Sequence, residues 1–203
     1  MGLPRRRPGG YSAVPMRTDD DADETLMLRY RNGDADAFAR LYARHRGPLY
    51  RYLLRQCGRP AVAEELFQDI WLKLIAARAG YTVQAKFGTW LYRIAHNRLV
   101  DHYRASARGL PLSYADDCPE WMEIPAPEEV QPEVREDRRR QSERLLELLA
   151  ELPEAQREAV LLKEEAGLSL EEIAQATGTG RETVKSRLRY ALARLRQGLG
   201  GAS

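Results

Sequence analysis

Aromatic and basic side chains alternate between residues 81 and 104, and this mixture suits single-stranded nucleic acid. Basic groups hold phosphates, while aromatic faces or pockets accept bases that have left the stack. Aromatic residues at these positions could equally belong to a hydrophobic core, so the pattern alone leaves both interpretations open. The rings are Tyr81, Phe87, Trp90 and Tyr92, and the charges are Lys86, Arg93, Arg98 and Arg104.

A second group of basic residues lies in the last predicted helix, residues 180–197. On a helical wheel its apolar residues share one face, which predicts that this face packs in a core. The opposite face is centred on Ser186 and has Arg and Lys side chains on both flanks. Such a helix can enter the major groove of DNA, with its middle at the base edges and its flanks at the phosphates. The alternative is an amphipathic helix that only packs on its own domain. The apolar residues are Val184, Leu188, Ala191, Leu192 and Leu195.

The residues before this helix favour DNA binding. Ser169 to Glu172 and Thr179 to Glu182 both have the form of a capping box, in which a hydroxyl caps a helix and a Glu returns to the cap residue. A tight turn with Gly178 separates the two boxes. Two short capped helices joined by such a turn, with the second one basic, predict a helix-turn-helix.

Helical periodicity also organises the first half of the chain. Apolar residues recur at spacings of three and four from Thr25 onward, with breaks at Asn32-Gly33, at Gly58 to Pro60 and in the irregular stretch 81–88. We therefore expect about four helices and no strand between residues 24 and 108.

Five prolines and an acidic surplus mark residues 109–136 as a flexible linker, because this proline density prevents a long helix. Helical patterns return at about 137–151 and 153–166, ahead of the helix-turn-helix. The predicted fold is all-α: two small helical domains, 24–108 and 137–203, joined by the linker. Residues 1–23 are predicted to be a disordered tail, and Met16 is an alternative start.

The chain of 203 residues has a net charge of only +2, but the charge is segregated. Residues 24–108 hold 15 basic and seven acidic side chains, residues 109–143 hold four and ten, and residues 180–203 hold six and one. This distribution predicts two polyanion-binding surfaces, with solvated helix faces as the plainer explanation.

Composition excludes several classes of protein. No stretch reaches the 18 to 20 or so apolar residues of a membrane helix, and the N-terminus lacks a secretory signal, so we expect a cytoplasmic protein without membrane insertion. The two cysteines and three histidines lack metal-ligand spacing, and we find no nucleophile–base pair or phosphate loop. We therefore predict no enzyme activity, no catalytic residue, no metal and no cofactor.

Longer motifs point to a family. Residues 63–74 (AEELFQDIWLKL) and 87–101 (FGTWLYRIAHNRLVD) closely resemble region 2 of the extracytoplasmic-function (ECF, group 4) sigma factors of bacterial RNA polymerase, in the sigma-70 family. Residues 152–157, 168–174 and 183–188 resemble region 4. The resemblance covers about 24–108 and 137–197 in the family's order, with a variable linker between.

This resemblance implies a transcription initiation factor that binds core RNA polymerase, directs it to promoters and assists promoter opening. It implies contacts with the beta-prime clamp helices and the beta flap, a place in the nucleoid when bound to polymerase, and an anti-sigma factor as a partner. The stretch 81–89 would receive a flipped base of the minus-ten element. For that element the implied residues are Lys86, Phe87, Thr89, Trp90, Arg93, Asn97, Arg98 and Arg104. For the minus-thirty-five element they are Arg181, Thr183, Lys185, Ser186, Arg187 and Arg189. For polymerase they are Glu65, Gln68, Asp69 and Trp71.

The sequence departs from the family at one position, because Tyr190 stands where a basic residue is usual and Arg189 would substitute for it. Two other functions stay open at this point. A stand-alone helix-turn-helix regulator would bind duplex DNA without polymerase, and a sigma-mimicking protein would capture an anti-sigma factor. The basic and aromatic stretch 81–104 argues against the second.

Overall fold

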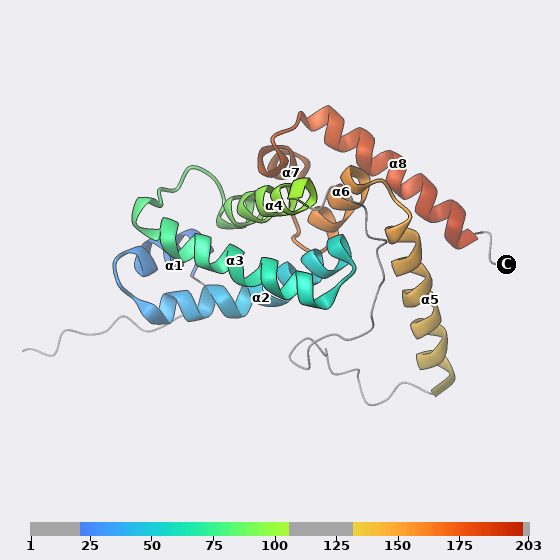
Figure 1. The fold of residues 1–203 in the computed structure, drawn as a ribbon, viewed down its shortest axis with the longest axis horizontal. Coiled ribbons are helices and arrows are strands. Elements are labelled where there is room, and N and C mark those ends of the chain that lie inside the picture. The colour runs from blue at the N-terminus through green and yellow to red at the C-terminus, as the bar shows by residue number, and fades with distance from the viewer. Residues whose placement is uncertain (1–20, 106–131, 201–203) are drawn as a thin grey trace, which may run out of the picture.

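The computed structural model describes residues 21–105 and 132–200, with side chains in the second segment from Arg139 onward. Within these ranges every regular element is a helix, which confirms the all-α prediction (Figure 1). Most of the predicted tail (1–23) and of the predicted linker (109–136) lies outside the described residues.

Four α-helices and one short 3-10 helix form the N-terminal domain. The side chain of Asp34 accepts a hydrogen bond of 3.2 Å from the Ala37 amide and so caps the second helix, which Gly58 ends with φ of +66°. Pro60 opens the third helix, where its missing N–H leaves no bond unmade. The elements are α1 (Asp23–Arg31), α2 (Ala35–Cys57), α3 (Pro60–Ala77), η1 (Arg78–Gly80) and α4 (Phe87–Ala105).

Four helices form the C-terminal domain. The capping box predicted at α7 is confirmed, since the Ser169 hydroxyl accepts from the Glu172 amide and the Glu172 carboxylate accepts from the Ser169 amide. The box predicted at α8 is not formed in this way, because α8 begins one residue later than a Thr179 cap requires and the Thr179 hydroxyl lies 3.0 Å from that of Thr177. The helices are α5 (Pro132–Ala150), α6 (Glu154–Glu164), α7 (Leu170–Thr177) and α8 (Arg181–Gly200).

One helix boundary and one core residue differ from the sequence-based prediction. α5 begins at Pro132, inside the predicted linker, because proline is well tolerated in a first helical turn. Leu192, predicted to be in the core, is 40% exposed, because it lies at the edge of the apolar stripe of α8. The buried residues of that stripe are Val184, Ala191 and Leu195.

The two domains pack against each other. α4 lies along α7, and α2 contacts both α5 and α6, as Figure 1 shows for the neighbouring α4, α6 and α7. Buried apolar residues of both domains form one continuous cluster, with Leu53 and Leu91 from the first domain and Leu161 and Leu168 from the second. The sequence left the relative placement of the domains open, and the structure brings them into direct contact.

Candidate nucleic-acid interface

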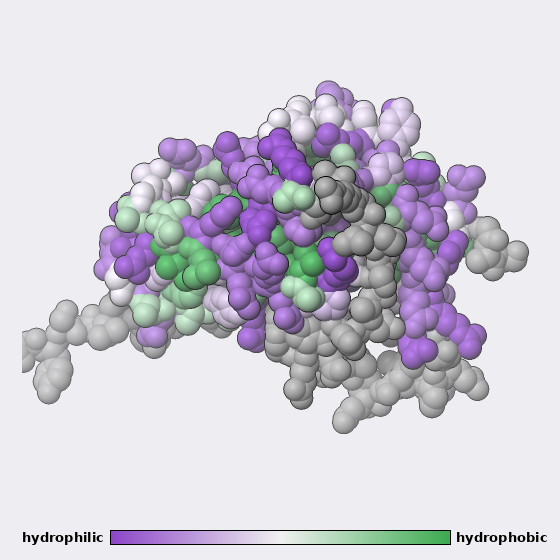
Figure 2. Space-filling view, viewed as in Figure 1, coloured by the Kyte–Doolittle hydropathy of each residue, from purple (hydrophilic) through white to green (hydrophobic). Residues whose placement is uncertain are grey.

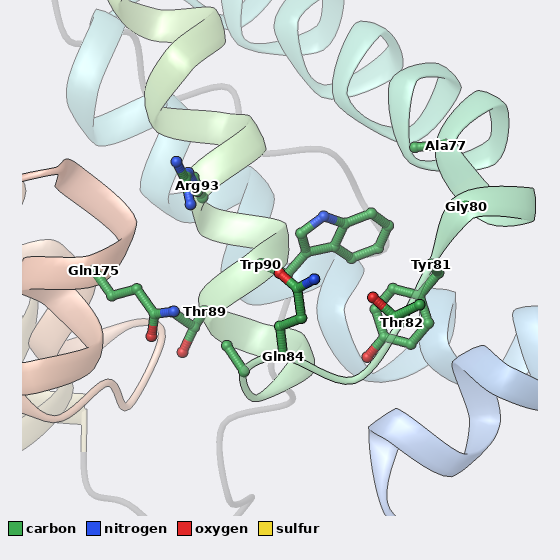
Figure 3. Close-up of a pocket in the computed structure, with 10 residues that line it drawn as sticks. Ala77, Gly80, Tyr81, Thr82, Gln84, Thr89, Trp90, Arg93 and Gln175 are labelled. Atoms are coloured by element: carbon green, nitrogen blue, oxygen red, sulfur yellow. The ribbon is translucent and has the colours of Figure 1, made fainter.

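A cavity of about 390 Å³ opens where η1, the segment after it, α4 and α7 meet. Figure 3 shows Trp90 and Arg93 extending from α4, Tyr81 and Gln84 from the connecting segment, and Gln175 from α7. The cavity therefore combines aromatic, amide, hydroxyl and guanidinium groups, which are the groups that bind a base and its phosphate. The remaining lining residues are Ala77, Gly80, Thr82, Ala85 and Thr89.

Two hydroxyls at this cavity are buried without a hydrogen-bond partner in the described part of the chain. They belong to Tyr81, which is 4% exposed, and Thr89, which is 1% exposed. Burial raises the pKa of Tyr81 to about 12, with Glu24 and Asp23 adding to the shift, so the phenol stays protonated near neutral pH. A buried polar group without a partner costs about 1–3 kcal/mol, which makes both hydroxyls candidates for contact with a polar ligand.

The connecting segment is fixed at both ends. The Arg31 guanidinium donates a 2.9 Å hydrogen bond to the backbone oxygen of Tyr81, and the Glu24 carboxylate accepts one of 2.6 Å from the Phe87 amide. The Tyr81 ring packs against Trp90 with centroids 4.9 Å apart, and Phe87 is completely buried beside Trp90. The cavity wall is thus built before any ligand arrives.

The predicted minus-ten residues divide into exposed and buried groups. Lys86, Arg93, Asn97 and Arg104 are exposed, whereas Phe87 and Thr89 are buried and Trp90 is half-buried. The sequence predicted cations together with aromatic rings, and the structure places cations on the surface of α4 beside a cavity lined by Tyr81 and Trp90. Phe87, in contrast, is part of the hydrophobic core.

Arg98 joins two of the predicted sites. Its side chain is 17% exposed and lies 2.7 Å from the Asp69 carboxylate and 3.3 Å from that of Glu65. This contact ties α3 to α4 and brings a residue predicted for DNA together with two predicted for polymerase.

The predicted polymerase surface follows the outer face of α3. Glu65 and Gln68 are exposed, whereas Trp71 is 5% exposed and packs against Phe38 and Tyr42. The sequence-based list lacked Leu72, which is 63% exposed beside these residues. In Figure 2 an apolar patch interrupts the hydrophilic surface where α1 and α3 lie in Figure 1. An apolar residue outside the buried stripe of α3 was the signal that could have identified Leu72.

The first turns of α8 present most of the predicted minus-thirty-five residues to solvent. Arg181, Thr183, Lys185 and Arg189 are exposed, and Ser186 and Arg187 are half-buried. Acidic neighbours pair with two of these cations, since Arg181 contacts Glu171 and Glu182 and since Lys185 lies 3.5 Å from Glu182. The Arg189 guanidinium lies over the ring of Tyr190, 4.9 Å from the ring centroid. Tyr190, which stands where the family usually has a basic residue, thus makes a cation–π contact with the neighbouring Arg189.

The described residues contain neither a metal-binding cluster nor a membrane-spanning helix. Within residues 21–105 and 132–200, no group of three or more His, Cys, Asp or Glu side chains is arranged to hold a metal ion. Over the same residues, no helix combines the length and apolar character needed to cross a bilayer.

Comparisons with known proteins agree with this arrangement of helices. Residues 41–109 match the family described as Sigma-70 region 2, and residues 142–195 match Sigma-70, region 4. The RNA polymerase sigma factor CarQ of Myxococcus xanthus is 32% identical over 174 residues, which cover 86% of this chain and 95% of CarQ. The ECF RNA polymerase sigma factor BldN of Streptomyces coelicolor is 30% identical over 82% of this chain, which spans only 63% of BldN.

A solved structure shares the fold. The sigma factor RpoE of Bartonella quintana, in complex with the anti-sigma factor NepR, superposes with a TM-score of 0.64 and 22% identity, over 83% of this chain and all of that one. The fold and the matched regions define a two-domain helical protein of the sigma-70 class. The chain belongs to the ECF sigma factors of RNA polymerase.

Proposed function

We propose that this chain binds core RNA polymerase, directs it to promoters with particular minus-ten and minus-thirty-five elements, and assists their opening. The observation that carries the proposal is the cavity at Trp90, with its unpartnered buried hydroxyls and the cations of α4 beside it. Family membership supplies the protein partner, and the helix-turn-helix supplies a second DNA-binding surface.

In the proposed complex an unstacked base of the non-template strand enters the cavity. Trp90 offers a ring face, while Thr89 and Tyr81 offer hydroxyls to the base edge. Lys86, with Arg93, Asn97 and Arg104, would hold the flanking phosphates. Leaving the stack costs a base a few kcal/mol, and stacking plus hydrogen bonds in a preformed cavity offset that cost.

The α8 surface would contact the minus-thirty-five element in the major groove. Thr183 and Lys185 lie in the first turns, where a recognition helix meets base edges. Arg181, Ser186, Arg187 and Arg189 would add phosphate and base contacts around them. DNA would displace the acidic partners of Arg181 and Lys185.

Polymerase would dock on the outer face of α3. Glu65, Gln68 and Asp69 are the polar residues proposed to meet the clamp helices, with Leu72 as an apolar anchor among them. Trp71 would act through the core that holds α3 in place, since it is buried. We propose that the C-terminal domain meets the beta flap, that the protein acts in the cytoplasm, and that an anti-sigma factor controls it. No residue is proposed to be catalytic.

Run-off transcription tests this function. Purified core polymerase, this chain and the promoter of its own operon should give a discrete transcript that is absent without the chain. The stand-alone regulator instead requires tight binding to duplex DNA by the protein alone. Failure both to transcribe and to co-elute with core polymerase would favour that regulator.

A further inference from the structure

We infer that Arg98 is a positioning residue for polymerase binding, which holds the Asp69 and Glu65 carboxylates of α3 in place and does not bind the minus-ten element. This role deepens the function proposed above and rests on it. The family resemblance placed Arg98 among the minus-ten residues. Its contacts, its side of α4 and the charges around it favour the polymerase surface instead.

The Arg98 side chain is already bonded to α3. Its Nε donates a 2.7 Å hydrogen bond to Oδ2 of Asp69, and its Nη2 lies 2.7 Å from the same oxygen. Nη2 also lies 3.3 Å from Oε1 of Glu65. The Arg98 side chain is 17% exposed, whereas those of Asp69 and Glu65 are 39% and 65% exposed. The cation is therefore the inner member of this group, and the two carboxylates face solvent.

Arg98 lies on a different side of α4 from the residues proposed to hold phosphates. At about 100° per residue, Arg93, Asn97 and Arg104 fall within about 40° of one another on the helix. Arg98 is about 100–140° away from each of them. These three residues are exposed, whereas Arg98 is directed towards the neighbouring α3. A DNA strand that follows the exposed residues therefore runs along another face of the helix.

The charges around Arg98 disfavour a phosphate contact. Two of its three nitrogens already face carboxylates. A phosphate that approached this guanidinium from solvent would meet the negative charges of Asp69 and Glu65, which are more exposed, and like charges repel. Arg98 therefore adds little to the attraction of α4 for DNA.

The same contacts favour a protein partner at the two carboxylates. Glu65 and Asp69 are four residues apart on α3, a spacing at which like charges repel, and Arg98 offsets that repulsion. Both contacts to Asp69 use Oδ2, so Oδ1 has no hydrogen-bond partner in the described part of the chain and can accept one from polymerase. A carboxylate that is held before docking loses less conformational freedom when it docks, and this raises affinity.

The test is a double-mutant cycle on the full chain, with Arg98→Ala, Asp69→Ala and the two together. Titration of each variant against purified core polymerase gives the affinity for core. Anisotropy with saturated holoenzyme, at several salt concentrations, gives the affinity for a labelled oligonucleotide that carries the non-template minus-ten strand of the chain's own operon promoter. Arg93→Ala is the matched comparison on the other side of α4, and Lys163→Ala, at an exposed position on α6, is the neutral control.

We expect Arg98→Ala to weaken core binding by about 2- to 10-fold, because the carboxylates must then be ordered during docking. The same substitution should have a smaller effect in a chain that already carries Asp69→Ala, since it acts through that carboxylate. A general weakening of the domain would instead add to the effect of Asp69→Ala. Arg98→Lys keeps the charge without the planar fork, so it should weaken core binding by less, and it provides a second reading if the alanine variant does not fold.

DNA binding should separate the two arginines of α4. In holoenzyme, Arg98→Ala should keep the wild-type affinity for the oligonucleotide and the wild-type salt dependence. Arg93→Ala should bind core normally and lower the oligonucleotide affinity, with a slope against log salt that is smaller by about 0.7, the value for one phosphate contact on a single strand. Lys163→Ala should behave as wild type in every measurement.

The outcomes distinguish this role of Arg98 from the proposed function. Unchanged core affinity in Arg98→Ala, additive losses in the double variant, or a smaller salt slope in Arg98→Ala would each overturn the positioning role while wild type still bound core and transcribed. Unchanged core affinity in Asp69→Ala would remove the clamp contact and the positioning role with it. Failure of the wild-type chain to bind core would overturn the proposed function itself.

Discussion

Replacing Thr89 by valine should affect folding and DNA binding in opposite directions. Thr89 lines the candidate cavity and is 1% exposed, and its buried hydroxyl has no hydrogen-bond partner among the described residues. Valine keeps the branched shape and a similar helix propensity, and it removes the hydroxyl. If that hydroxyl binds a base, removing it should stabilise the free protein and weaken its complex with DNA.

The magnitudes follow from the two environments. An unpaired buried hydroxyl costs about 1–3 kcal/mol, so Thr89→Val should leave the free energy of unfolding unchanged or raise it by up to that amount. A hydrogen bond to the base contributes about 0.5–1.5 kcal/mol net, so the complex should weaken by about 2- to 13-fold. Thr25→Val, at an exposed position on α1, is the matched control and should change neither quantity.

Two measurements decide this prediction. Urea denaturation of the free chain gives the free energy of unfolding, and anisotropy of a labelled minus-ten strand with the reconstituted polymerase holoenzyme gives the affinity. The reasoning would be refuted if Thr89→Val lowered stability by more than about 1 kcal/mol, the typical net value of one hydrogen bond, while the affinity stayed at the wild-type value.

Three further predictions test the other surfaces. Lys185→Ala with Arg187→Ala should abolish promoter-specific run-off transcription but spare co-elution with core polymerase, because both side chains are proposed to contact DNA and neither is proposed to contact polymerase; loss of both would indicate misfolding. Asp69→Ala should weaken core binding in a pull-down titration, and an unchanged affinity would contradict the clamp assignment. The hydrogen bond from the Ser169 amide, helped by Lys86, lowers the pKa of Glu172 below its ordinary 4.5. A lowered carboxyl pKa stabilises the fold above about pH 4.5, and that contribution is lost as the pH falls through the folded-state value. Urea midpoints at about pH 7 and about pH 4 should therefore differ less in Glu172→Gln than in wild type, and equal differences would rule out this linkage.

Local structure could be predicted from the sequence wherever neighbouring residues determine it. The apolar spacing around Leu66, Ile70 and Leu74 predicted α3, and Ser169 with Glu172 predicted the start of α7. These features depend on contacts between residues three or four apart, which any sequence displays directly. The exposed cations of α4 and α8 were predictable for the same reason, because helical periodicity separates an apolar face from a polar one.

The candidate site was predictable only in part. The sequence indicated aromatic and basic residues near 81–104 and left open whether Phe87 belongs to the core or to the site, and it did not indicate that Arg98 bonds to Asp69. Periodicity reports which residues are apolar, and it does not report which neighbouring helix covers them. The unpartnered hydroxyl of Thr89 likewise could not be predicted from the sequence, since its burial depends on residues from several helices.

Sequence by itself determined the helices, the two domains, the helix-turn-helix and the family to which the chain belongs. Only the tertiary structure decided that Glu158 meets Tyr52 across 106 residues of chain, and that Gln175 borders the cavity at Trp90. Such contacts join the surfaces of two domains, and the helical periodicity of each domain is complete without them. No spacing of residues along the sequence therefore predicts them. Their free energy depends on how two finished domains fit together, and that fit exists only once both have folded.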